Sequence, residues 1–184
     1  MRRRNIKRII FVLFLLLAVI AVIYVIQDRN ILQRRYDAET GVLVTRVHDG
    51  DTISVIMNTE KKKVRLIGID APETGQRPWG KRAKKYLETL VNASEWRVRL
   101  EFDIDKRDKY GRFLAYVWTE NGELVNLLMV KSGYAMLYTI PPNVKYANEL
   151  REAQREARNM RLGIWGEKGL KEKPSNYRKR YPRM

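Results

Sequence analysis

The chain contains no cysteine and a single histidine, His48. These shortages exclude Cys/His zinc sites, cysteine nucleophiles and phosphodiesterases built on paired histidines. A serine hydrolase could use His48 alone, but the chain has no G-x-S-x-G motif, and His48 lies in a strand-like run, V-L-V-T-R-V-H. Carboxylates and arginines therefore remain as the groups that could carry chemistry.

Acidic residues are few compared with basic ones. The chain has 37 Lys and Arg against 21 Asp and Glu, which gives a formal net charge of +16. Only five of the basic residues precede the apolar run described next, so most of the excess belongs to the rest of the chain. Such an excess favours a polyanionic partner, either nucleic acid or anionic lipid head groups, without distinguishing the two.

One long apolar run covers residues 9–26, 18 residues without charge or proline. It reaches the lower length limit of a membrane-spanning helix, and the basic residues before it favour a cytoplasmic N-terminus. A cleaved signal peptide is the alternative, but the run is long for one and no small-x-small site follows it. We therefore expect a single-pass protein of the cell membrane with an extracytoplasmic domain. The expected segments are 1–8 (cytoplasmic and basic), 9–26 (transmembrane anchor), 27–41 (linker), 42–166 (folded domain) and 167–184 (flexible basic tail).

The remaining pattern indicates an α+β domain. Strand-like segments are followed or separated by turn residues such as Asp-Gly and Asn-Gly, and three segments show helical spacing of apolar residues. A five-stranded β-barrel of the OB type with three packed helices fits this count, and such barrels bind nucleic acid on one face. The expected strands are 42–48, 52–57, 62–69, 96–102 and 113–118, and the expected helices are 79–91, 124–131 and 143–160.

Two aspartates could form a metal site. Asp51 and Asp70 each lie at the end of an expected strand or turn, and their carboxylates can converge if the first and third strands are neighbours. Oxygen ligands alone select a hard cation, Ca²⁺ or Mg²⁺. Taken by itself, the Asp49-Gly50-Asp51 sequence is more simply a hairpin turn.

Two arginines and a glutamate could bind a phosphodiester and promote its hydrolysis. Arg65 interrupts an apolar strand, where a buried charge needs a partner, and Arg112 stands at the start of another strand. Guanidinium groups bind phosphate through two hydrogen bonds and stabilise charge that develops during its reaction. Glu73 follows Pro72 in an expected turn and could act as a general base. Taken alone, each of these three residues is at least as well explained as an ordinary surface side chain as by a functional role.

Three motifs occur together in the order D-G-D-T, R-L-I-G-I-D-A-P-E and D-K-Y-G-R. In this order and spacing they resemble the staphylococcal-nuclease-like (thermonuclease) family, over residues 42–165. The resemblance implies an OB barrel with three helices. It also implies Ca²⁺-dependent hydrolysis of DNA and RNA with low sequence specificity, leaving 3′-phosphates.

The resemblance further implies roles for nine residues in three groups. The metal ligands would be Asp51, Asp70 and the backbone carbonyl of Ala71. The catalytic residues would be Arg65, Glu73 and Arg112. The substrate-binding residues would be Lys109, Tyr110 and Tyr138, although Tyr138 could instead fill the core. The loop 74–79 is shorter than in the best-known secreted member, so the substrate-side lysines of that loop cannot be placed in this chain.

Two other functions remain open. Some relatives of this fold have lost the active-site residues and only bind nucleic acid or partners, and the basic surface could chiefly bind anionic lipid. The presence of Asp51, Arg65, Asp70, Glu73 and Arg112 together favours the enzyme. The expected partners are single- and double-stranded DNA, RNA, and the membrane through one N-terminal helix, and no protein partner is inferred.

Overall fold

The computed structural model describes residues 13–24 and 41–182. The chain divides into two compact units, Met1–Glu39 and Thr40–Met184. In the first unit, residues 13–24 are helical and their side chains are exposed. Within the two described ranges, no helix is long and apolar enough to cross a membrane. The expected segment 1–8, almost all of the linker 27–41 and both ends of the run 9–26 lie outside the described residues.

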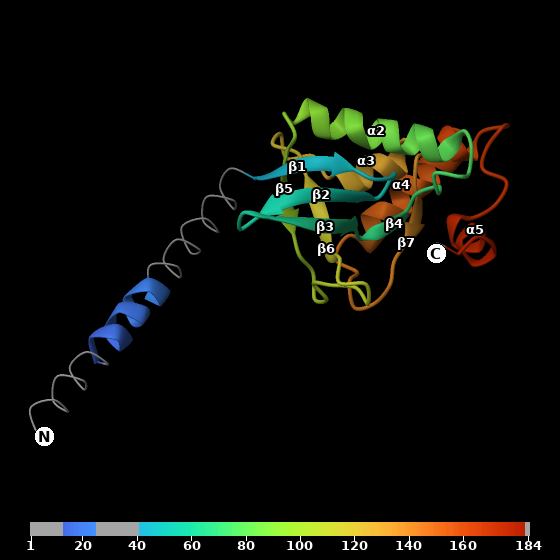
Figure 1. Cartoon of the computed structure of the whole chain (residues 1–184). Coiled ribbons are helices and arrows are strands. Elements are labelled where there is room, and N and C mark those ends of the chain that lie inside the picture. Colours follow the sequence, from blue (N-terminus) through green and yellow to red (C-terminus); the bar gives the residue numbers. More distant parts are fainter. Residues whose placement is uncertain (1–12, 25–40, 183–184) are drawn as a thin grey trace, which may run out of the picture. The chain divides into compact units, whose positions relative to one another are not determined.

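A closed β-barrel forms the centre of the second unit (Figure 1). Its strand order is β1-β2-β3-β6-β5, with β3 and β6 parallel and all other neighbours antiparallel. The expected α+β domain with a five-stranded barrel is therefore confirmed. The strands are β1 (Val42–Val47), β2 (Thr52–Met57), β3 (Glu60–Leu66), β5 (Arg97–Glu101) and β6 (Phe113–Trp118).

β-Branched residues fill the barrel core. Val44, Ile53, Val55 and Val64 come from three neighbouring strands and are at most 2% exposed. Branched side chains suit the pleated surface of a strand, and burying each one contributes roughly 1.5–3 kcal/mol.

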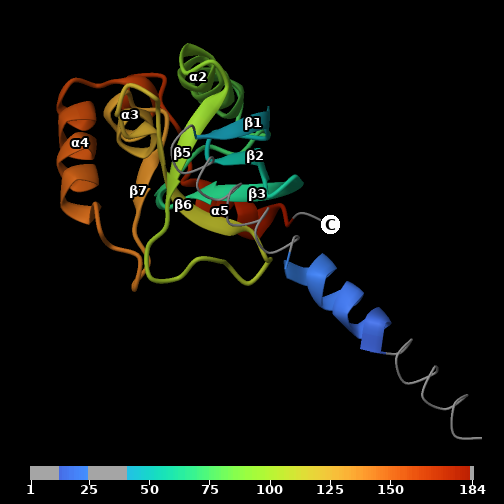
Figure 2. The ribbon, with the colours of Figure 1, turned by 90° about the vertical axis from the view of Figure 1, so that its left-hand side faces the viewer.

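Three helices pack around the barrel, as expected (Figure 2). Helix α2 (Trp79–Ala93) buries a stripe at four-residue steps, Ala83, Leu87 and Val91, and lies beside β1. Helices α3 (Val125–Lys131) and α4 (Ala147–Asn159) pack against each other. Helix α4 begins at Ala147 and ends at Asn159, whereas the sequence predicted a helix over 143–160.

The third expected strand, 62–69, is wrong as a single element. Strand β3 ends at Leu66, and Gly68, with φ of +77°, starts a separate strand β4 (Gly68–Asp70). Strand β4 pairs with β7 (Met136–Tyr138), which the sequence pattern did not predict. The continuous apolar run hides the break, because only the backbone of glycine turns here without strain. The break carries Asp70 out of the barrel sheet.

The expected flexible tail is wrong for residues 167–182. After the 3₁₀ turn η1 (Gly163–Trp165), the chain folds back and forms α5 (Pro174–Arg180). Pro174 is buried at the first helical position, where its missing N–H costs nothing. The basic composition suggested a solvated segment, but Arg178 is paired with Asp70 and Glu73 of the domain, and Arg180 with Glu172 of the tail itself.

Candidate active site

The turn between β1 and β2 presents Asp51. Its backbone N–H donates to Asp49 Oδ1 at 3.1 Å, and its Oδ1 accepts a hydrogen bond from the Thr52 hydroxyl at 3.0 Å. A Cβ on Gly50 would lie 2.6 Å from the Cβ of Ala71, so only glycine lets the turn approach Ala71 this closely. The turn is therefore packed against the end of β4.

Asp51 and Asp70 lie close together, but not because the first and third strands are neighbours, as the sequence suggested. Strands β1 and β3 are not neighbours, since both flank β2. The convergence instead comes from the turn packing on Ala71, whose N–H donates to Asp51 Oδ2 at 2.9 Å. Both carboxylates are buried, with Asp51 7% and Asp70 3% exposed.

Arg65 joins the two aspartates. From β3, its Nη1 lies 3.1 Å from Asp51 Oδ2 and its Nη2 lies 3.4 Å from Asp70 Oδ1. The guanidinium also donates to the carbonyls of Leu66 and Ile69, each at 3.0 Å. The expectation that a charge in this apolar strand would be paired is confirmed.

The two carboxylates create a strong demand for positive charge. Burial raises the pKa of Asp51 above its ordinary value, and the charge of Arg65 opposes that rise. Burial likewise raises the pKa of Asp70, against the hydrogen bonds it accepts from Arg178. A further cation bound here would therefore favour the ionised form of both groups.

The donor set fits a hard cation. Among the described residues, no three Asp, Glu or His side chains converge as a metal cluster, so protein carboxylates would supply only part of the coordination. Two carboxylates, a backbone carbonyl and waters are ligands that Ca²⁺ accepts. The guanidinium of Arg178 on Asp70 is a cation at this position, which agrees with the charge of the site.

Glu73 lies close to the same group of charges. Its Oε1 is 2.8 Å from Arg178 Nη1, and its backbone N–H donates to Gln76 Oε1 at 2.9 Å. Arg178 Nη1 is also 2.8 Å from Asp70 Oδ1, so Glu73 and Asp70 share one partner. The structure thus places Glu73 next to Asp70, and the role of Glu73 as a general base stays a prediction.

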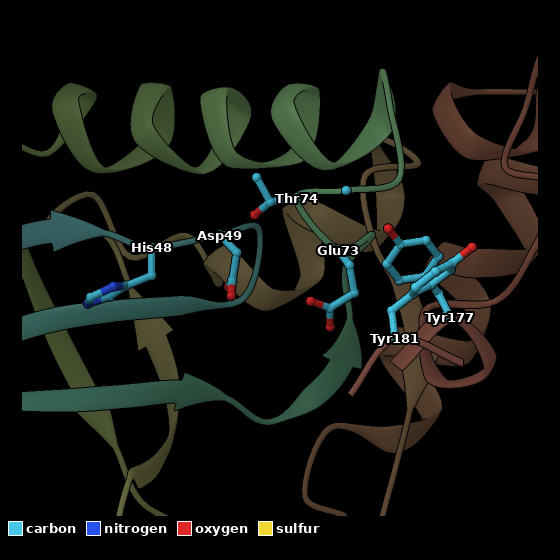
Figure 3. Close-up of a pocket in the computed structure, with 7 residues that line it drawn as sticks. His48, Asp49, Glu73, Thr74, Tyr177 and Tyr181 are labelled. Atoms are coloured by element: carbon cyan, nitrogen blue, oxygen red, sulfur yellow. The ribbon is translucent and has the colours of Figure 1, made fainter. Parts of the chain in front are cut away.

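A cleft of about 320 Å³ opens beside Glu73 (Figure 3). Its lining includes His48 and Asp49 on one side and, on the other, Tyr177 of α5 and Tyr181, which follows that helix, with Glu73 between them. Burial and nearby positive charge lower the pKa of His48, whose Nε2 lies 2.8 Å from Ser54 Oγ. Ser54 is 1% exposed, so this pair cannot act as an accessible nucleophile and base.

Arg112 belongs to a loop at the start of β6. Its Nε and Nη2 each lie 2.7 Å from Asp108 Oδ2, which holds the guanidinium. In the parallel pairing of β3 and β6, Arg65 is opposite Leu114, two residues beyond Arg112. Lys109 and Tyr110 share this loop, and Tyr110 is 73% exposed.

Tyr138 lies on β7, opposite Gly68 of β4. It is 43% exposed, so the alternative that it fills the core is wrong. In the short β4-β7 sheet Asp70 pairs with Met136, so Tyr138 lies two residues along β7 from the position opposite Asp70. The substrate role of Tyr138 stays a prediction, as do the other roles implied by resemblance.

Comparison with known proteins agrees with this geometry. Residues 63–167 match the family described as "Staphylococcal nuclease homologue". A thermonuclease of Staphylococcus intermedius is 44% identical over 128 residues, which are 67% of this chain and 74% of the relative. The endonuclease YncB of Bacillus subtilis is 42% identical over 135 residues, 70% of this chain and 63% of that protein. A thermonuclease of Staphylococcus hyicus is 39% identical over 127 residues.

The chain belongs to the staphylococcal nuclease family. Membership confirms the resemblance drawn from the three motifs and places the chain among the nucleases, which are hydrolases. The matched residues include both arginines, Asp70 and Glu73 of the site. Helix α5 lies beyond them.

The sequence did not predict the contribution of α5 to the site of this nuclease-family chain. Arg178 contacts Asp70 and Glu73, and Tyr177 lies in the cleft wall beside Glu73. The signal that could have found the helix is Lys173-Pro174 followed by a charged segment with tyrosines four residues apart, since proline at the first position and an i, i+4 aromatic pair favour a helix.

Proposed function

We propose that the chain is a membrane-tethered, calcium-dependent nuclease that hydrolyses phosphodiester bonds of DNA and RNA with low sequence specificity. The observation that carries the proposal is the convergence of two buried carboxylates, Asp51 and Asp70, with Arg65 between them. With Glu73 beside Asp70, the cluster combines ligands for a hard cation with a base and a phosphate-binding arginine.

Asp51, Asp70 and the carbonyl of Ala71 would hold Ca²⁺. When bound, Ca²⁺ would polarise a phosphoryl oxygen and neutralise its charge. Asp49, which accepts the N–H of Asp51, would orient that ligand from behind.

The remaining chemistry belongs to side chains of the chain. The Glu73 carboxylate accepts a proton from a water molecule, whose oxygen bonds to phosphorus as the bond to the 5′ oxygen breaks. Arg65 and Arg112 stabilise the charge that develops on the phosphoryl group, with Arg112 near the leaving oxygen. The leaving 5′ oxygen takes up a proton from solvent, Glu73 releases to solvent the proton that it accepted, and the other product carries a 3′-phosphate.

Three residues would bind the substrate outside the reacting phosphate. Lys109 and Tyr110 lie in the loop of Arg112, where the ammonium group of Lys109 is 5.2 Å from the ring of Tyr110. This exposed pair suits a neighbouring phosphate, and the exposed ring of Tyr138 suits a stacked base. Contacts of this kind carry little sequence information, which agrees with low specificity.

The apolar run at residues 9–26 supports the membrane tether. It is long enough to span the hydrocarbon layer as a helix, and the basic residues before it favour a cytoplasmic N-terminus. The nuclease domain then lies outside the cytoplasm. Carbonate extraction of membranes and protease accessibility in intact cells test the tether and its orientation.

The activity is tested with the full-length chain in detergent, on single- and double-stranded DNA and on RNA, in Ca²⁺, Mg²⁺ or chelator. We expect cleavage in Ca²⁺ that leaves 3′-phosphates, and a loss of about 10²- to 10⁴-fold in Glu73→Gln, the range typical of a general base. Glu149→Gln, at an exposed position of α4, is the matched control, and this variant should cleave normally. Salt-sensitive binding without cleavage would instead establish a non-catalytic nucleic-acid-binding module.

A further inference from the structure

The guanidinium of Arg178 occupies the carboxylates on which the proposed reaction depends. Nη1 lies 2.8 Å from Asp70 Oδ1 and 2.8 Å from Glu73 Oε1, and Nη2 lies 3.1 Å from Asp70 Oδ2. Paired hydrogen bonds between a guanidinium and a carboxylate are among the strongest that side chains form. A single side chain of α5 therefore holds a proposed calcium ligand and the proposed base together.

Helix α5 is fitted to this position by the loop that follows Glu73. Gln76 accepts the N–H of Glu73 and donates its own amide to the carbonyl of Glu172 at 2.8 Å. A Cβ on Gly75 would lie 2.2 Å from the hydroxyl of Tyr177, so the absent side chain leaves room for that ring. Contacts from the loop after Glu73 and from the segment 172–177 thus hold α5 in place. Figure 3 shows Tyr177 facing Glu73 across the cleft.

Burial strengthens the contact. The side chains of Asp70 and Glu73 are 4% and 12% exposed, while that of Arg178 is 34% exposed. Burial opposes the charge of Arg178, but the hydrogen bonds to Asp70 and Glu73 raise its pKa above the ordinary value, so it stays a cation. The charges are poorly screened in such a site.

Arg178 and Ca²⁺ need the same oxygens. Arg178 takes both oxygens of Asp70, and Arg65 also lies near Oδ1. A divalent cation on Asp70 would meet a guanidinium at contact distance, and two cations repel strongly at that range. Binding of Ca²⁺ and seating of Arg178 therefore oppose each other, and each weakens the other by the same factor.

We propose that α5 is an autoinhibitory segment, in which Arg178 holds Asp70 and Glu73 until Ca²⁺ displaces it. The segment sets the calcium concentration at which the nuclease becomes active. The inference rests on the proposed function, since it assigns Asp70 to the metal. Helix α5 lies beyond residues 63–167, the residues matched to the family.

Calcium affinity, measured by titration calorimetry on the full-length chain without nucleic acid, tests the proposal independently of activity. Arg178→Gln should bind Ca²⁺ about 5- to 100-fold more tightly than the unmodified chain, the usual range of coupling between two sites. Arg180→Gln removes the same charge from the same helix, but Arg180 pairs with Glu172 instead. This control should leave the affinity within about twofold, because exposed pairs contribute little.

The outcomes separate the two proposals. Equal calcium affinity in Arg178→Gln and the unmodified chain would overturn autoinhibition and leave calcium dependence standing. Equal tightening in Arg180→Gln would also overturn it, because net charge would then be the cause. If no variant binds Ca²⁺, the calcium-dependent function and the inhibition are both wrong.

Hydrogen exchange supplies a second readout. By reciprocity, saturating Ca²⁺ should release α5 in the unmodified chain, so the backbone amides of residues 175–180 should exchange faster with Ca²⁺ than without. Barrel amides such as those of β2 should keep their protection and serve as the internal control. Unchanged or slower exchange in α5 on calcium binding would show that Arg178 is not displaced.

Discussion

Arg65 serves two kinds of partner at the site. Without substrate, its guanidinium compensates the buried charges of Asp51 and Asp70, at 3.1 and 3.4 Å. In the proposed reaction the same group also binds the scissile phosphate. Removing Arg65 therefore disturbs the folded protein as well as the proposed catalysis, whereas Arg112 forms a partly exposed pair with Asp108 in a surface loop.

The two arginines should consequently give different results on substitution. Arg112→Ala should lower kcat about 10²- to 10³-fold, because it removes a donor aimed at developing charge. Its free energy of unfolding should change by less than about 1 kcal/mol, as for a partly exposed pair. Arg65→Ala should lower kcat and also destabilise the calcium-free protein by about 3–5 kcal/mol, since buried carboxylates lose their partner.

Kinetics and urea unfolding of both variants, with and without Ca²⁺, check this contrast. Calcium should restore much of the stability of Arg65→Ala, because it supplies the missing positive charge. A calcium-free Arg65→Ala protein as stable as the unmodified chain would show that the carboxylates do not need that charge.

Tyr116 gives the fold a dependence on alkaline pH. It is 1% exposed, and its hydroxyl donates to Asp103 Oδ2 at 3.2 Å. Burial, together with the charge of Asp103, raises the pKa of Tyr116 from 10.0 to about 12. Because the folded protein keeps the proton more tightly, its stabilising effect is complete below pH 10 and is lost as the pH rises toward 12.

The free energy of unfolding should therefore fall between pH 10 and 12 in the unmodified chain. Tyr116→Phe loses the hydrogen bond to Asp103, so it should be less stable than the unmodified chain at pH 8. Because phenylalanine cannot ionise, the variant should lose less stability between pH 10 and 12. Denaturant unfolding at several pH values measures the slope. Parallel curves for the two proteins would mean that Tyr116 does not cause the alkaline loss.

At the scale of elements, two glycines fix the junction between α3 and η1. A Cβ on Gly163 would lie 2.1 Å from the carbonyl oxygen of Gly133, and one on Gly133 would lie 2.4 Å from that of Leu162. The N–H of Ile164 donates to the Gly133 carbonyl at 2.8 Å. The segment that leads to α5 is thus joined to the domain through close backbone contact.

Gly163→Ala should accordingly destabilise the domain by more than about 2 kcal/mol, because a positive φ and a backbone clash combine. Gly122→Ala is the matched control. Gly122 also has a positive φ, +79°, but nothing lies within 4 Å of a Cβ built there. Gly122→Ala should lower the free energy of unfolding by only about 1–2 kcal/mol, the cost of placing alanine at a positive φ. Thermal unfolding compares them, and equal losses would exclude the contact as the cause.

Elements with a regular pattern could be predicted, and irregular ones could not. The alternating strands of the barrel and the four-residue apolar steps of α2 appear directly in the sequence. Strand β4 was hidden, because Gly68 breaks an apolar run without interrupting its hydrophobicity. Helix α5 was hidden too, because its docking depends on charges distant in sequence, such as Asp70 with Arg178.

The same distinction applies to the site. The identities of Asp51, Arg65, Asp70 and Glu73 could be selected from the motifs, because each motif stays together in the sequence. Their mutual contacts depend on the close approach of Gly50 to Ala71, which no local pattern reveals. The cation on Asp70, Arg178, lies 108 residues away and could be found only in three dimensions.

At the scale of the whole molecule, the basic charge and the proposed membrane tether would both determine where the domain meets its partners. The net charge of +16 attracts polyanions, and an apolar run at one end would hold the domain at a membrane surface. The acidic cluster of Asp51, Asp70 and Glu73 is a local exception within this basic chain, and it is also the proposed catalytic centre. A cation at that cluster is therefore the point on which the whole account depends.

The most direct test is the rate of single-stranded DNA cleavage by the full-length chain against calcium concentration, for the unmodified protein and for Asp70→Asn. We expect no cleavage in chelator and a cleavage rate that saturates with Ca²⁺. The Asp70→Asn protein should need at least about tenfold more calcium, since one charged ligand is lost. Full cleavage in chelator, or an unchanged calcium dependence in Asp70→Asn, would contradict this expectation.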